Sequence, residues 1–97
     1  MSFNKNLFSE HLNNKDYNFC ISLLRNEITD ILTKRIQEKD CSFVYSTVSS
    51  LRKAVFTYLS DDEKEIIVEF QQLHFEESPS YYELSRMMEL YKNLLEV

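Results

Sequence analysis

Apolar residues recur at intervals of three and four along most of the chain, the spacing that brings side chains to one face of a helix. The clearest stretch follows Asp16 and reaches about Glu38, and its apolar positions are Tyr17, Cys20, Ile21, Leu24, Ile28, Ile31, Leu32 and Ile36. A helix of that length extends for roughly 35 Å. We therefore expect residues 16–38 to form the long helix on which the other elements pack.

Weaker forms of the same pattern predict four shorter helices, over residues 2–12, 42–59, 60–75 and 80–97. Residues 43–48 are the exception, because they are rich in residue types that favour strands. A lone strand would have no partner, however, and a helical stripe runs through the segment at Val44, Val48, Leu51, Val55 and Leu59. We therefore predict a helix there as well.

Polar residues mark where three of these helices begin. Asp16 is placed to cap the long helix, because its carboxylate can accept a hydrogen bond from a free backbone amide. Ser60 with Glu63, and Ser80 with Glu83, have the spacing of a capping box, in which each side chain bonds to the other residue's amide. A serine-proline pair just upstream is an alternative start for the last helix.

The composition also favours helices. The chain has no glycine and one proline, so it lacks the glycine-containing turns on which tight β-hairpins depend. Apolar residues make up 43% of the chain, which is enough for the core of one small domain. The short connections make consecutive helices antiparallel neighbours. We predict a single domain over residues 1–97 with an all-α fold, a compact antiparallel bundle of four to five helices.

Charge is unevenly distributed, and this bears on the kind of partner. Residues 1–59 hold eight basic and six acidic side chains, whereas residues 60–97 hold three basic and ten acidic ones. Phosphate binding requires lysine and arginine, so we expect no direct binding of nucleic acid. No apolar run is long enough to span a membrane, no signal-like segment opens the chain, and two cysteines are too few for a secreted disulfide framework. These features predict a cytoplasmic protein.

The residue types that carry chemistry are sparse. His11 and His74 have no neighbouring nucleophile or orienting group in the sequence. Cys20 and Cys41 lie far from both histidines, and the spacing of His74 and Glu77, one helical turn, occurs once where a bundle metal site needs several such motifs. Without glycine, phosphate-binding loops are excluded. We predict no enzyme activity, no metal and no cofactor, and we identify no small-molecule substrate.

The last predicted helix carries the best candidate surface. Its regular apolar positions are Tyr81, Leu84, Met88, Tyr91 and Leu95, widened by Met87, Leu90 and Leu94. Tyr82 and Met87 project away from the first of these lines, and exposed tyrosine and methionine are enriched at protein interfaces. Acidic residues lie nearby in the sequence. The partner-binding residues are therefore predicted to be Tyr82, Met87, Glu76, Glu77 and Asp61.

The long helix also resembles a known family. It opens with the pair Asp16–Tyr17, continues with small and apolar residues, and carries Arg25 and Glu27 among them. This arrangement and the order of the later helices resemble HEPN-type helical bundles. Ribonucleases of that family have an arginine shortly before a histidine, and no arginine here precedes a histidine at that spacing. The resemblance therefore implies a non-catalytic member, a binding or regulatory module that is often dimeric and linked to RNA or toxin–antitoxin biology.

Together these observations predict a non-catalytic protein–protein interaction or regulatory module that binds another protein or itself, most simply as a homodimer. Two alternatives stay open. One is a degenerate HEPN-like regulator in RNA-linked, toxin–antitoxin or mobile-element defence. The other is a small acidic inhibitor of a nucleic-acid-binding protein, in which carboxylates take the place of phosphates.

Overall fold

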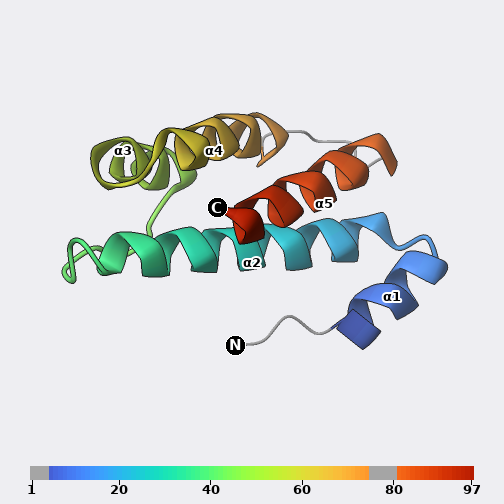
Figure 1. Ribbon diagram of the computed structural model, residues 1–97. Coiled ribbons are helices and arrows are strands. Elements are labelled where there is room, and N and C mark those ends of the chain that lie inside the picture. The colour runs from blue at the N-terminus through green and yellow to red at the C-terminus, as the bar shows by residue number, and fades with distance from the viewer. Residues whose placement is uncertain (1–4, 75–80) are drawn as a thin grey trace.

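The computed structural model describes residues 5–74 and 81–97, and these ranges hold five helices and no strand (Figure 1). The helices are α1 (Lys5–Asn13), α2 (Tyr17–Gln37), α3 (Val48–Tyr58), α4 (Asp61–His74) and α5 (Tyr81–Glu96). The molecule measures 40 × 25 × 24 Å. The prediction of an all-α bundle is therefore confirmed.

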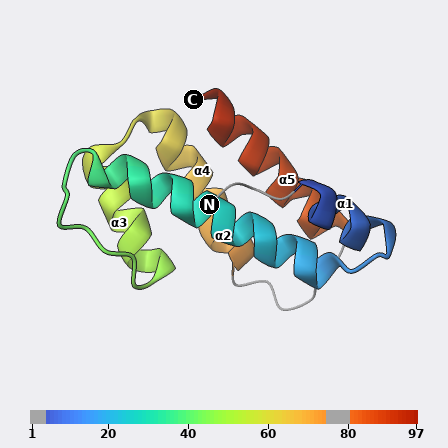
Figure 2. The same cartoon turned by 90° about the horizontal axis from the view of Figure 1, so that it is seen from below.

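The long helix α2 is the centre of the bundle. It contacts α1, α3 and α5, while α4 packs against α3 and α5. Figure 1 shows α3, α4 and α5 on one side of α2 and α1 on the other, and Figure 2, seen from below, shows α2 in front of α4. Two helices that are not consecutive, α2 and α5, run in the same direction, because Tyr17 contacts Tyr81 near their starts and Arg35 contacts Leu94 near their ends.

The core is built from the predicted apolar faces. In α2, six of the eight predicted positions are buried, namely Cys20, Ile21, Leu24, Ile28, Leu32 and Ile36, and Tyr17 and Ile31 pack against them. The fully buried residues of α3, α4 and α5 that complete the core are Leu51, Val55, Ile67, Phe70, Leu84, Met87 and Leu94. Burying a side chain of this size stabilises the fold by roughly 1.5–3 kcal/mol. The apolar stripe predicted for α2 is therefore the face of this helix that packs in the core.

Two of the predicted caps are present. The Asp16 carboxylate accepts a hydrogen bond from the Phe19 amide at 3.3 Å. The Ser60 amide donates to Glu63 Oε1 at 3.1 Å, and the Glu63 amide donates to Ser60 Oγ at 3.4 Å, as a capping box requires. The other predicted box includes Ser80, which lies outside the described residues.

The prediction of a helix from residue 42 is wrong at its start. The backbone is irregular over residues 43–47, and α3 begins at Val48. Thr47 has an extended backbone, and it forms a capping box with Ser50 that fixes the first turn there. Upstream, Phe43 and Tyr45 pack against the core while the residue between them is exposed, an alternation typical of extended chain. The strand-favouring residues therefore prevail over the helical stripe in this segment.

Candidate functional site

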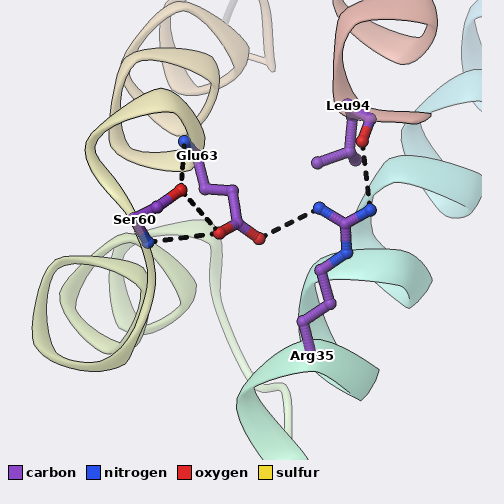
Figure 3. A network of polar contacts seen from close by, with 4 residues as sticks. All are labelled: Arg35, Ser60, Glu63 and Leu94. Carbon is purple, nitrogen blue, oxygen red and sulfur yellow. Dashed lines mark hydrogen bonds and ion pairs between the residues drawn. The ribbon is translucent and has the colours of Figure 1, made fainter. Parts of the chain in front are cut away.

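A buried polar network joins α2, α4 and α5 at one end of the bundle (Figure 3). Arg35 Nη1 donates to Glu63 Oε2 at 3.0 Å, and Arg35 Nη2 donates to the Leu94 carbonyl oxygen at 3.0 Å. Glu63 Oε1 also accepts a hydrogen bond from the Ser60 hydroxyl at 2.8 Å. Burial alone would raise the pKa of Glu63, but the hydrogen bonds from Ser60 and Arg35 outweigh it, and the pKa is lowered overall. Glu63 is thus held as a carboxylate inside the bundle.

A second arginine of α2 makes a matching contact at the other end. Arg25 Nη2 donates to the Leu73 carbonyl oxygen at 2.9 Å, in the last turn of α4, and to Glu83 Oε1 at 3.2 Å, in the first turn of α5. Glu83 is buried, which the sequence did not indicate, because its position suggested a helix cap facing solvent. No local pattern indicates this role, because Glu83 and its partner Arg25 are 58 residues apart in the sequence.

The orientation of α5 corrects one predicted site residue. Its buried residues are Glu83, Leu84, Met87, Leu90 and Leu94. Met87 is 0% exposed, so the prediction that it projects toward a partner is wrong. Tyr82 is 73% exposed, as that prediction required. The physical reason is that burial of Glu83 turns the helix so that Met87, one turn further on, faces the core.

The same orientation leaves an apolar stripe in contact with solvent. Tyr81 is 63% exposed, Met88 38% and Leu95 57%, and they follow one another at intervals of seven residues. Residues seven apart lie on nearly the same side of a helix. We call these three residues the α5 stripe. Periodicity predicted that Tyr81, Met88 and Leu95 all lie on the core-facing line of this helix, so their exposure is a second correction.

The predicted acidic residue Asp61 lies at the start of α4, beside a groove. The groove has a volume of about 610 Å³ and is lined by Phe56, Asp61, Lys64, Glu65, Val68, Glu69 and Gln72. Phe56 is 44% exposed, and two cations lie near its ring, with Arg52 at 5.3 Å and Lys64 at 5.9 Å from the centroid. The sequence analysis missed Phe56. Glu76 and Glu77, the other two predicted acidic residues, lie outside the described residues.

The remaining candidate groups are held in local contacts. His11 Nδ1 lies 3.1 Å from Asp16 Oδ2, and its ring stacks on Phe19 with 3.8 Å between centroids. Cys20 is buried and Cys41 is exposed, and neither forms a disulfide. Burial raises the pKa of the Cys20 thiol. Over residues 5–74 and 81–97, no three histidine, cysteine or acidic side chains are grouped as a metal site would require.

Comparison with protein-family models, curated protein sequences and solved structures gives no match to this chain. The HEPN-like resemblance therefore stays a prediction. Within the part of the chain that the structure describes, no helix is both long and apolar enough to cross a membrane. Two surfaces, the α5 stripe and the groove beside Phe56, remain as the candidates on which a function can be argued.

Proposed function

We propose that this chain is a non-catalytic protein-interaction module that forms a homodimer through the α5 stripe. The observation that carries the proposal is the exposure of three large apolar side chains, Tyr81, Met88 and Leu95, along one helix. Seven-residue apolar spacing is the pattern by which two helices pair side by side. Water contact along such a stripe is unfavourable, and a second helix would remove it.

The choice of a second copy as partner rests on symmetry. Tyr81 and Leu95 lie equally far from Met88 in the sequence. If two copies of α5 pair in antiparallel fashion around a two-fold axis at Met88, Tyr81 of each copy lies opposite Leu95 of the other. Glu89, the residue next to Met88, pairs with Arg86 of its own helix at 2.9 Å, so its charge is balanced beside the axis. Tyr82 is placed at the edge of this interface.

The area of the α5 stripe determines the affinity expected for the dimer. Three partly exposed side chains bury much less than the roughly 1,600 Å² of a standard interface. We therefore expect weak association, with a dissociation constant of roughly 100 μM. At this affinity the fraction of dimer depends on the local concentration of the protein.

Sedimentation velocity between about 10 μM and 1 mM protein tests the proposal. The wild type should shift from monomer to dimer over this range, and Met88→Glu should remain a monomer because a charge would be buried at the axis. Val44→Glu, which places the same charge on an exposed apolar residue before α3, is the matched control and should dimerise normally. A wild type that stays monomeric at 1 mM, or a dimer that Met88→Glu leaves intact, would contradict the proposal.

A further inference from the structure

A second surface, the groove beside Phe56, combines apolar side chains with several carboxylates. The groove beside Phe56 is lined only by residues of α3 and α4, which lie together on the side of α2 away from α1 (Figure 1). Phe56 and Val68 supply its apolar surface. A volume of about 610 Å³ is within the range of sites that take a ligand or a few side chains of a partner.

The charges around the groove are only partly balanced. Two cations, Arg52 and Lys64, lie near the Phe56 ring, so the excess of carboxylates is at the other end of the groove, around Glu65. Glu69 is neutralised by Arg86, whose Nη2 lies 2.6 Å from Glu69 Oε2, and Lys64 pairs with Asp61 at 3.3 Å. Glu65 is exposed, and its carboxylate has no ion pair within residues 5–74 and 81–97.

The acidic surface continues past Glu65. That residue also lines a smaller neighbouring hollow of about 330 Å³, together with Asp62, Ile66, Asn93, Glu96 and Val97. Among the residues that the structure describes, no lysine or arginine lines this hollow. Its carboxylates repel one another, and a cationic partner would relieve that repulsion at short range. Phosphate groups would be repelled, which argues against a nucleic acid as occupant.

We propose that the groove binds a basic amphipathic segment of another protein. An apolar side chain of that segment packs on Phe56 and Val68, and its lysine or arginine side chains lie against Glu65 and Asp62. The apolar floor supplies affinity, because exposed aromatic anchors dominate interface energies. The unbalanced carboxylates determine the specificity, because they attract positively charged segments and repel negatively charged ones.

The test uses two fluorescein-labelled peptides of about 14 residues, four helical turns, with identical leucine positions. One carries lysine at every polar position and the other glutamate. Fluorescence anisotropy on the full chain should show binding of the lysine peptide alone, weakening as NaCl rises from about 50 to about 300 mM. Phe56→Ala should weaken binding about tenfold, and Glu65→Gln a few-fold. Val44→Ala and Glu38→Gln, both at exposed residues outside the groove, should leave it unchanged.

Three outcomes would overturn the proposal. The first is no binding of the lysine peptide at about 1 mM, the weakest range in which a specific contact is measurable. The second is equal binding of the two peptides. The third is binding that Phe56→Ala and Glu65→Gln both leave unchanged while circular dichroism shows each variant folded, because the peptide would then occupy another surface. A single-stranded oligonucleotide that competes for the groove would also contradict the charge argument.

Discussion

Replacing Glu63 with glutamine should destabilise the protein although the two side chains have nearly the same shape. Glu63 is buried, and its Oε2 accepts a hydrogen bond from Arg35 Nη1 at 3.0 Å. In the variant, Oε1 can still accept from the Ser60 amide, but an NH₂ group then faces the arginine, so that two donors oppose each other. Arg35 loses its charged partner while remaining bonded to Leu94.

The size of the effect follows from the exposure of both partners. Removing one member of a buried ion pair costs about 3–5 kcal/mol. The Arg35 side chain is 25% exposed, so water can replace part of the lost contact and the cost should fall to the bottom of this range or slightly below it. We expect a loss of about 2–3 kcal/mol, which lowers the melting temperature by roughly 10–20 °C in a domain of this size. Urea and thermal unfolding at pH 7, followed by circular dichroism, measure it.

A matched control lies in the same turn of the same helix. Asp61→Asn makes the same change from acid to amide, but the Asp61 side chain is 97% exposed and forms a surface ion pair with Lys64. Loss of a surface pair and of a favourable charge near the helix N-terminus should cost less than about 1 kcal/mol. If the loss of unfolding free energy in Glu63→Gln is within about 0.5 kcal/mol of the loss in Asp61→Asn, the buried network does not stabilise the fold as argued.

The pH dependence gives an independent check on the same residue. Because the folded state lowers the pKa of Glu63 below its ordinary value of 4.5, the unfolded chain binds the proton more readily. The stabilisation is therefore fully present above pH 4.5 and is lost as the pH falls through the folded-state pKa. The stability gap between wild type and Glu63→Gln should narrow in acid, and a gap that stays constant between pH 7 and about pH 2 would contradict this cause.

Two further predictions concern neighbouring or chemically matched pairs. Met87→Ala should cost about 2–5 kcal/mol of unfolding free energy, because Met87 is buried. Met88→Ala should cost less than about 1 kcal/mol, because Met88 is partly exposed. Equal losses in urea unfolding would mean that α5 is oriented differently. Cys41 is exposed and should react with a thiol reagent at the rate of a small thiol. Cys20 is buried and its pKa is raised, so it should react only when its helix opens. Similar rates in single-cysteine variants would show that Cys20 is accessible.

Much of the fold could be predicted from the sequence, because local rules determine it. The apolar stripe of α2 and the caps at Asp16 and Ser60 depend on residues within one or two turns of each other. The start of α3 could not be predicted in the same way. Val44 fits a helical stripe, but Thr47 forms a capping box with Ser50, so that the helix begins only at Val48. The stripe and the cap are two local patterns that predict different starts.

The candidate site was predicted less well, because it depends on contacts across the bundle. Periodicity gave a wide apolar face for α5 without fixing which edge faces the core. That choice is made by Glu83, whose partner Arg25 is 58 residues away in the sequence. The exposure of Tyr82 was anticipated and that of Met87 was not. Phe56 was missed because a single apolar residue near the end of a helix carries no periodic signal.

The two arginines of α2 connect the stability of the bundle with the surface that it presents. Arg25 holds the first turn of α5 through Glu83 at 3.2 Å, and Arg35 holds its last turn through the Leu94 carbonyl at 3.0 Å. A helix fixed at both ends cannot rotate about its own axis without breaking a charged contact, and such contacts cost more to break than neutral ones. In this rotational position of α5, Met87 is buried and Met88 is partly exposed. The charged contacts of Arg25 and Arg35 thus fix the same orientation of α5 that buries Leu84, Met87, Leu90 and Leu94, and this orientation leaves the α5 stripe exposed.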